Sequence, residues 1–325
     1  MKDYIALTKP RITWLILMST GVGYFFGLKR EWSGAADWAL LLHTLIGTGL
    51  IASGTATLNQ WYEREADTLM RRTSGRPLPS GKMTANRALW FGIALAILGF
   101  AELAWFVNVL SAVLGAFTLW SYLFIYTPLK QRSHLSTVVG ALPGAMPPLL
   151  GYAASYGGLT PEAWTLFAIL FIWQFPHFLA IAWMYREDYA RAGIRMLPVV
   201  EPDGMSTGRQ IILYASTLIP VSLFPVLLGM SGKVYLVGAL LLGGWFLYTG
   251  VRVAFDLTNV RARRVLFASI IYLPVIYCPR YPSILILHSP STFQSIRRKT
   301  HGNSRELPKD SQRTHRKVNS ILYSK

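Results

Sequence analysis

Long apolar stretches alternate with short polar segments along most of the chain. Eight of these stretches cover residues 12–28, 38–58, 87–107, 109–126, 137–156, 163–185, 211–230 and 234–253, and a ninth begins at Val265. Each approaches the roughly 20 residues that an α-helix needs to cross the apolar part of a bilayer. The pattern therefore predicts an all-α fold: a polytopic membrane protein built as a bundle of nine transmembrane helices.

The ninth apolar stretch is expected to form an irregular helix, because Cys278, Pro279 and Arg280 interrupt it. The chain then becomes rich in Ser, Thr, Lys and Arg, with ten basic side chains against only Glu306 and Asp310. Such a composition is typical of disorder. We therefore expect a transmembrane domain over residues 1–277 and an atypical, basic and disordered tail over residues 278–325. Binding of this tail to anionic lipid head groups is the alternative.

The fifth apolar stretch is unusually rich in helix-breaking residues. It contains Gly140, Pro143, Gly144, Pro147, Pro148 and Gly151. An interior proline would cost a soluble helix about 3 kcal/mol, but membrane proteins tolerate broken helices that line a cavity or are buried in protein. Two interpretations stay open, a cavity wall and a kink packed through small residues.

The composition agrees with a membrane location. Only 14% of the 325 residues are charged and 52% are hydrophobic, whereas soluble domains carry roughly 25% charged residues. The net charge of +17 would suit nucleic acid, but the basic residues of residues 1–277 lie mostly at the ends of apolar stretches, as the positive-inside rule requires. We expect the lipid bilayer as a partner, no nucleic acid, and a multi-pass protein of the cell inner (cytoplasmic) membrane.

The polar segment that follows residue 58 carries the main candidate chemistry. Asn59, Glu63 and Asp67 are spaced four residues apart, so on a helix their side chains would form one column. Oxygen ligands of this kind suit a hard divalent cation such as Mg²⁺, and the arginines between residues 64 and 76 suit phosphate oxygens. The segment predicts a diphosphate site, and the alternative is a solvated loop that only sets membrane topology.

A second polar segment, residues 186–195, contains Glu187 and Asp188. Counting the apolar stretches alternately across the membrane puts this segment, the segment after residue 58 and the loop around Lys130 on one side. Because these loops hold most of the Lys and Arg of residues 1–277, that side is expected to be cytoplasmic. The two acidic segments should therefore converge on one active site at the cytoplasmic face.

Four motifs together resemble a known family. Asn59, Glu63 and Asp67 followed by RTSGRPLPSG (72–81) resemble the first signature of the intramembrane aromatic prenyltransferases of the UbiA type. Within that superfamily, three further segments resemble the protohaem IX farnesyltransferase family: LTKPRI (7–12), GAMPP (144–148), and PHF (176–178) leading to DYARAG (188–193). The resemblance covers about residues 1–277. Tyr185 departs from the wider superfamily, in which Asp is frequent at this position.

This resemblance implies a helix bundle around a central cavity and a prenyltransferase activity. The reaction would be Mg²⁺-dependent transfer of a farnesyl group from farnesyl diphosphate to a vinyl group of haem B, giving haem O. A haem A synthase or a terminal oxidase assembly is the implied protein partner. The implied site residues fall into three groups: catalytic Asn59, Glu63, Asp67, Glu187 and Asp188, with Asn59, Glu63, Asp67 and Asp188 on the metal; diphosphate-binding Arg64, Arg72, Arg76, Lys130 and Lys9; and haem-binding His177.

His177 lies within the sixth apolar stretch, eleven residues before Asp188. Ionisable residues inside a membrane are candidates for function, and imidazole is a ligand of haem iron. On an unbroken helix the two residues would share a face about three turns apart, although Pro176 is a possible bend. The alternative is a hydrogen-bonded structural histidine.

Two other functions stay open from the sequence. A related prenyltransferase with another aromatic acceptor, a hydroxybenzoate or a chlorin, would need the same diphosphate site. A transporter would also contain broken helices with polar groups, but its charges would lie at mid-membrane, whereas the acidic residues here cluster at one surface.

Overall fold

The computed structural model describes residues 1–28 and 32–277, and every regular element within them is helical. The predicted tail of residues 278–325 lies outside the described residues, and so does the predicted interruption at Pro279. The elements are α1 (Lys2–Leu7), α2 (Pro10–Gly27), α3 (Ala35–Tyr62), α4 (Arg64–Thr68), α5 (Ala85–Phe106), α6 (Val109–Trp120), the π-helix η1 (Ser121–Tyr126), α7 (Thr127–Leu129), α8 (Ser136–Gly144), α9 (Met146–Tyr156), α10 (Pro161–Met184), α11 (Arg186–Arg191), α12 (Leu197–Val200), α13 (Met205–Val221), α14 (Phe224–Leu227), α15 (Lys233–Phe255) and α16 (Asn259–Ile276).

Six helical segments of the described chain are long and apolar enough to cross a membrane, which confirms an all-α, multi-pass fold. They are Ala35–Tyr62, Ala85–Phe106, Val109–Leu129, Pro161–Met184, Met205–Leu227 and Lys233–Phe255. The other three expected spans correspond to α2, to the pair α8 and α9, and to α16. The chain breaks between α8 and α9 at Ala145, and three arginines occupy the first turns of α16. The number of nine transmembrane helices therefore stays a prediction.

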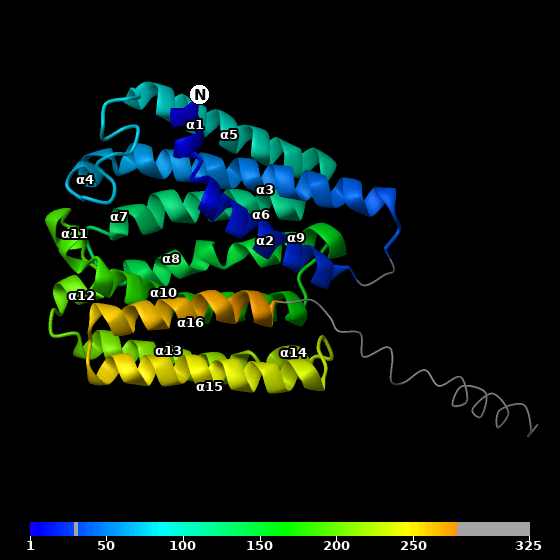
Figure 1. Cartoon of the computed structure of the whole chain (residues 1–325). Helices are drawn as coiled ribbons and strands as arrows, with labels where there is room; N and C mark the ends of the chain where they lie inside the picture. The colour runs from blue at the N-terminus through cyan, green and yellow to red at the C-terminus, as the bar shows by residue number, and fades with distance from the viewer. Residues whose placement is uncertain (29–31, 278–325) are drawn as a thin grey trace, which may run out of the picture. The chain divides into compact units, whose positions relative to one another are not determined.

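The long helices lie side by side with their axes roughly along one direction (Figure 1). Helix α3 packs on α5, α2 packs on α9, and α13 packs on α15. Helix α10 lies at the centre of this packing, because α8, α9, α13 and α16 all contact it. The short helices α4, α7, α11 and α12 gather at one end of the bundle (Figure 1).

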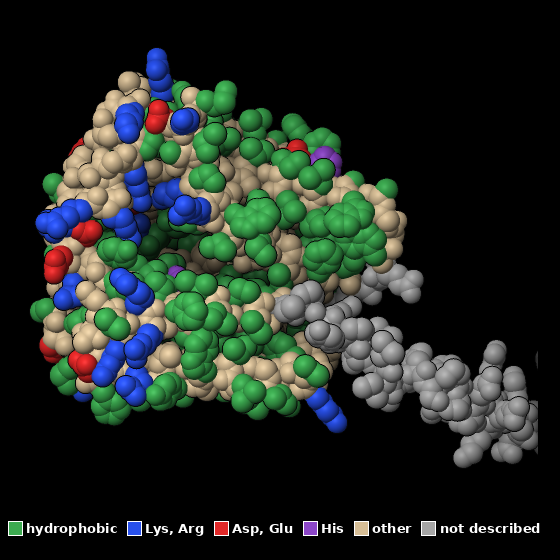
Figure 2. All heavy atoms as spheres, in the orientation of Figure 1, with side chains coloured by type: hydrophobic (Ala, Val, Ile, Leu, Met, Phe, Trp, Pro, Cys, Tyr) green, Lys and Arg blue, Asp and Glu red, His purple; other side chains and the backbone are tan. Residues whose placement is uncertain are grey.

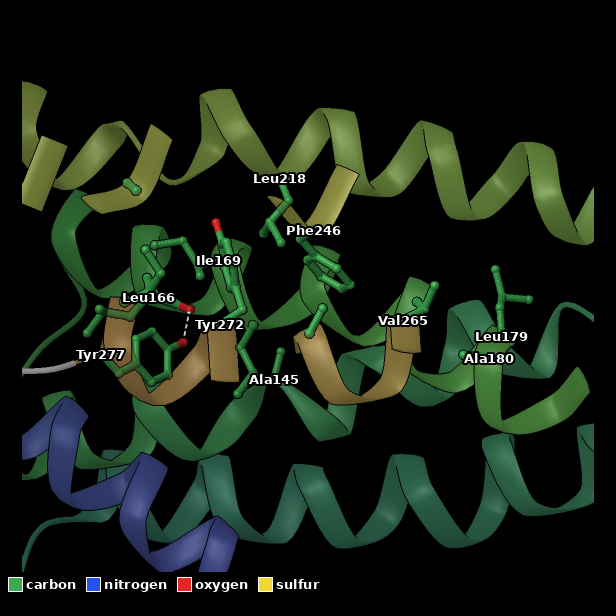
Figure 3. Packing of buried hydrophobic residues seen from close by; sticks show 14 of the residues in the cluster. Ala145, Leu166, Ile169, Leu179, Ala180, Leu218, Phe246, Val265, Tyr272 and Tyr277 are labelled. Carbon is green, nitrogen blue, oxygen red and sulfur yellow. Dashed lines mark hydrogen bonds between the residues drawn. The ribbon is translucent and has the colours of Figure 1, made fainter. Parts of the chain in front are cut away.

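The largest hydrophobic core lies around α10, α15 and α16 (Figure 3). Leu166 and Ile169 of α10 lie close to Tyr272 of α16, and Phe246 of α15 closes the same layer. The hydroxyl of Tyr277 donates a hydrogen bond to the carbonyl oxygen of Leu166 at 2.7 Å. This bond pairs two polar groups that would otherwise be costly in apolar surroundings.

The Gly- and Pro-rich stretch forms two helices rather than one bent helix. Helix α9 begins with Pro147 and Pro148 in its first turn, where proline is tolerated because its missing N–H has no partner in the helix anyway. A Cβ atom at Gly151 would lie 1.9 Å from the carbonyl oxygen of Thr20 in α2. A Cβ atom at Gly23 of α2 would lie 2.1 Å from the carbonyl oxygen of Pro148. Small residues thus allow α2 and α9 to touch backbone to backbone, which supports the packing interpretation for this half of the stretch.

The contact between α2 and α9 makes a stability prediction. Gly151→Ala should lower the free energy of unfolding by about 1–3 kcal/mol, because the added methyl group meets backbone atoms that cannot rotate away. Gly244→Ala in α15 is the matched control, since a Cβ atom there would meet nothing within 4 Å. Thermal unfolding of both variants in lipid nanodiscs measures the difference. Equal melting temperatures for the two variants would contradict the close packing.

Candidate functional site

The candidate residues lie at the end of the bundle that carries α4, α7, α11 and α12 (Figure 1). In the space-filling view this side of the molecule is hollowed between the upper and lower helices, and Lys and Arg side chains gather around the hollow (Figure 2). The end of the bundle is therefore strongly electropositive, as a site for an anion requires.

The two polar segments meet there, although more than a hundred residues separate them. Ala66 and Met70 from the first segment form a buried cluster with Ala192 and Ile194 from the second. Arg72 also donates a hydrogen bond to the hydroxyl of Tyr189 at 3.4 Å. The convergence expected from counting the apolar stretches is thus present.

The loop around Lys130 joins the same group. The backbone N–H of Arg195 donates to the carbonyl oxygen of Lys130 at 2.8 Å, which fixes the second polar segment against the end of the α6–α7 segment. Three parts of the chain therefore build this end of the bundle, and their order in space could not follow from any one of them.

Asn59, Glu63 and Asp67 do not lie on one unbroken helix. Helix α3 ends at Tyr62, and Glu63 caps it with φ −88° and ψ 6° before α4 begins. The spacing nevertheless survives: the N–H of Glu63 bonds to the carbonyl of Asn59 at 2.9 Å, and the N–H of Asp67 bonds to the carbonyl of Glu63 at 2.8 Å.

Each oxygen-bearing side chain of this column has its own basic partner. Lys9 Nζ donates to Asn59 Oδ1 at 3.2 Å. Lys130 Nζ lies 2.8 Å from Glu63 Oε1. Arg76 Nη1 lies 2.6 Å from Asp67 Oδ2, and the Asp67 side chain is only 1% exposed. Buried carboxylates need such partners, because an unpaired buried charge is strongly destabilising.

These contacts move the pKa values of the groups that pair. Burial opposes ionisation of Glu63, but Lys130 and Lys9 outweigh it, so the pKa of this carboxyl lies below its ordinary value. Burial also opposes the charge on Lys130, but Tyr126 and Glu63 raise the pKa of its ammonium group well above the usual value. The Glu63–Lys130 pair is therefore held in its ionised form.

Lys9 behaves in the opposite way. Burial, followed by repulsion from Arg76 and Lys130, lowers the pKa of its ammonium group to about 7. Its backbone is left-handed, with φ 47°, at the junction of α1 and α2, a conformation that costs energy for a residue other than glycine. Lys9 is thus held beside two cations that disfavour its charged form, and a bound anion would favour that form again.

The oxygen donors of this site fit a hard divalent cation. Asp67 Oδ1 is fully buried and has no hydrogen-bond partner among the described residues, so one carboxylate oxygen is left for another ligand. No group of three or more His, Cys, Asp or Glu side chains in the described chain gathers closely enough to hold a metal by itself. Mg²⁺ is usually bound through one or two protein carboxylates, and substrate phosphates and water complete its shell.

Arg72 and Arg64, two further candidates for binding diphosphate, differ in their surroundings. Arg72 lies over the rings of Tyr185 and Tyr189, with its guanidinium carbon 4.8 Å and 5.6 Å from the ring centres. Arg64 does not join the group: it bonds to the carbonyl of Trp61 at 2.9 Å and to Glu65 at 3.1 Å. Tyr185 therefore supplies an aromatic face to an arginine.

Among the described residues, the acidic side chains of the second segment do not pair with those of the first. Asp188 forms an ion pair with Arg191, one turn along α11. Glu187 is exposed and pairs with no described residue. His177 and Asp188 lie on different helices, because α10 ends at Met184 and α11 starts after Tyr185, so the shared face that an unbroken helix would give them is not formed. Helix α10 itself continues through Pro176.

His177 lies inside the membrane span of α10, roughly 10 Å from its end at Met184 by the rise of 1.5 Å per residue. Its Nδ1 lies 2.7 Å from the hydroxyl oxygen of Ser269 in α16. Its ring stacks on Trp173, with ring centres 4.6 Å apart. The side chain is thus fixed through one nitrogen and one ring face.

Sequence reasoning missed an aromatic column opposite the acidic one. Tyr122, Tyr126 and Lys130 have the same four-residue spacing, and Lys130 Nζ lies 4.4 Å from the ring centre of Tyr126. Here η1 is a π-helix in which the N–H of Thr127 bonds to the carbonyl of Tyr122, five residues back. Thr127 in turn accepts a hydrogen bond from Asn59 at 3.3 Å. The repeated spacing was visible in the sequence, but the π-helix was not.

Known proteins resemble this chain in sequence and in fold. The UbiA prenyltransferase family matches residues 16–271. A protein named protoheme IX farnesyltransferase from Solibacter usitatus (strain Ellin6076) is 68% identical over 286 residues, which cover 85% of this chain and 97% of that protein. Two solved structures share the fold. One is described as digeranylgeranylglyceryl phosphate synthase (TM-score 0.69, 18% identity, 85% of this chain and 95% of that chain). The other is a UbiA homologue from Archaeoglobus fulgidus bound to DMAPP and Mg²⁺ (TM-score 0.58, 16% identity, 85% and 98%).

The buried pair of Asp67 and Arg76 generates a stability prediction. Arg76→Met should lower the free energy of unfolding by roughly 3 kcal/mol. This value is near the lower end for breaking a buried ion pair, because the side chain of Arg76 is 28% exposed. Adding Asp67→Asn to that variant should recover part of the loss, since no charge is then left unpaired. Thermal unfolding measures both effects.

Arg64→Met is the control for that experiment, because its partner Glu65 is 87% exposed. A surface pair of this kind contributes about 0–1 kcal/mol. An equal loss in Arg64→Met and Arg76→Met would show that the Asp67 pair has no special weight.

Proposed function

The chain belongs to the UbiA prenyltransferase family, and we propose that it transfers a farnesyl group from farnesyl diphosphate to a vinyl group of haem B, giving haem O. The observation that carries this proposal is the set of three cation-paired oxygen donors, Asn59, Glu63 and Asp67, at one end of an apolar bundle. The haem acceptor is supported by the relative named protoheme IX farnesyltransferase, which is 68% identical to this chain.

In the proposed reaction, the bond between the first farnesyl carbon and the diphosphate oxygen breaks, and diphosphate leaves. The terminal carbon of the vinyl group forms the new carbon–carbon bond. Water supplies the hydroxyl group to the other vinyl carbon and loses a proton. No oxidant or reductant is required.

The basic residues of the site would hold the leaving diphosphate. Arg76 and Lys130 carry their charges next to Asp67 and Glu63, and a diphosphate can take over these contacts when it binds. Arg72 and Lys9 are the further candidates at this end. Guanidinium groups bind phosphate oxygens in pairs, and ammonium groups act as point charges.

Asn59, Glu63, Asp67 and, from the facing segment, Asp188 are the residues we propose for Mg²⁺. Asp67 Oδ1 is the best-supported ligand, because it is buried without a partner in the described chain. When bound, Mg²⁺ would neutralise the negative charge that develops on the diphosphate. The structure of the homologue from Archaeoglobus fulgidus with DMAPP and Mg²⁺ supports this metal.

The farnesyl group would leave as an allylic carbocation, which must be kept from water until the vinyl group attacks. Tyr122 and Tyr126 present their rings beneath Lys130, where aromatic faces can stabilise positive charge. The apolar helix walls exclude water from the same region. These residues would therefore decide whether the cation meets haem or solvent.

The acceptor would lie deeper than the diphosphate. His177 is the proposed haem-binding residue, about two turns inside the membrane from the polar end of α10. We further propose that the site faces the cytoplasm at the inner membrane, because the basic loops gather at this end. A haem A synthase or a terminal oxidase assembly would then receive the product.

Product analysis tests the proposal. The full-length chain, expressed in cells that lack their own haem O activity, should produce haem O that is identified by its mass. Asp67→Asn should lower the yield by about 100-fold or more, as expected when a group that stabilises the leaving charge is removed. Asp256→Asn, an exposed acid on the connection between α15 and α16, is the control and should leave the yield unchanged. If the protein instead prenylates a hydroxybenzoate or a chlorin and makes no haem O, the proposal of haem as the acceptor is wrong.

Metal removal gives a separate prediction. Excess EDTA should abolish diphosphate release from farnesyl diphosphate, and added Mg²⁺ should restore it. Haem binding, followed through its Soret absorption band, should persist in EDTA because His177 lies away from the oxygen donors. Full diphosphate release in excess EDTA would contradict the metal assignment.

A further inference from the structure

The hydrogen bonds and ring contacts around His177 determine which of its ring nitrogens carries the proton. We propose that Ser269 and Trp173 hold the neutral imidazole of His177 with its proton on Nδ1, so that Nε2 is an axial ligand for a metalloporphyrin. The acceptor would then be recognised through its metal, and a porphyrin without a metal would not satisfy the site. This inference rests on the proposed function and concerns the acceptor end of the same site.

The proton position follows from counting hydrogen-bond donors. Ser269 Oγ lies 2.6 Å from the carbonyl oxygen of Leu266, and a carbonyl can only accept. The single hydroxyl proton of Ser269 is therefore used in that bond. Since Ser269 Oγ is also 2.7 Å from His177 Nδ1, it must accept a proton from this nitrogen. His177 Nδ1 thus carries the hydrogen, and the neutral ring keeps its lone pair on Nε2.

The orientation of the ring follows from Trp173. Its indole stacks on His177 with an angle of 27° between the ring planes, and its Nε1 donates to the carbonyl oxygen of Ser269 at 2.8 Å. Phe178 meets the imidazole edge to face at 5.3 Å. Two residues one turn apart on α10 therefore bind the same fully buried residue of α16, which leaves the imidazole little freedom to turn.

The second ring nitrogen is left for a ligand. No residue of the described chain hydrogen-bonds His177 Nε2. A structural histidine between two helices would gain by satisfying both nitrogens, because an unpaired polar atom in apolar surroundings is costly. Histidines that bind a metal typically donate one nitrogen to a protein oxygen, as His177 does to Ser269, and keep the other nitrogen for the metal.

Porphyrin titrations of the full-length protein in nanodiscs test this inference. The probes are zinc protoporphyrin, which has one open axial position, and metal-free protoporphyrin, which has none. Wild-type protein should bind the zinc compound at least about 10-fold more tightly and shift its Soret band to longer wavelength. His177→Ala should abolish both the shift and the preference.

Ser269 variants separate positioning from packing. Ser269→Ala should weaken zinc protoporphyrin binding by about 10–100-fold, the usual effect of losing a hydrogen bond to a metal ligand, and leave binding of the metal-free porphyrin unchanged. Ser269→Thr keeps the hydroxyl and should retain the Soret shift. If Ser269→Ala does not fold, Trp173→Phe is the substitute, because it keeps the stacked ring and removes the N–H bond to Ser269.

The outcomes distinguish this inference from the proposed function. A wild-type protein that binds both porphyrins equally, or a Ser269→Ala variant with unchanged zinc porphyrin affinity and spectrum, overturns the inference even if haem O is made. Axial ligation of zinc protoporphyrin without haem O formation supports the inference and counts against the proposed function alone.

Discussion

A carboxylate buried at the end of a membrane bundle must be paired with a cation, and this requirement shapes the whole polar end of the molecule. Asp67 obtains its partner from the loop after α4, Glu63 from the end of the α6–α7 segment, and Asn59 from the junction of α1 and α2. Because each partner comes from a different part of the chain, satisfying these three groups also brings the helices into register. The cations that pair with these side chains are the ones that the proposed diphosphate would also contact.

The backbone contacts between α2 and α9 serve the same site indirectly. Lys9 precedes α2, and α2 is held against α9 by the close approaches of Gly23 and Gly151. Without a hydrophobic driving force between helices in lipid, such close packing and buried hydrogen bonds are what define helix positions. The glycines therefore help to place Lys9, although it lies several turns away from them. This packing role explains the glycines of this stretch.

Local sequence patterns were sufficient for the helical membrane fold, for the two polar segments and for their convergence. They failed where the chain's partners are distant. Ser269 is 92 residues from His177, and nothing around either residue indicates the bond between them. Likewise, the four-residue spacing suits one helix through Glu63, whereas α3 ends at Tyr62. Arg64 was a candidate because guanidinium groups suit phosphate. Its sequence neighbours Trp61 and Glu65 instead bind its side chain, away from the other candidate residues.

The π-helix η1 has a consequence for how this fold tolerates insertions and deletions. A π-helical turn accommodates one residue more than an α-helical turn of the same rise. Deleting one residue between Ser121 and Tyr126 would therefore give an ordinary α-helical turn and leave the residues after it close to their present orientation. Deleting one residue from α6 instead would rotate everything after it by about 100°, and Lys130 would then turn away from Glu63, which it now contacts at 2.8 Å. The π-helix is thus the part of this helix that can lose one residue without moving the charge at its end.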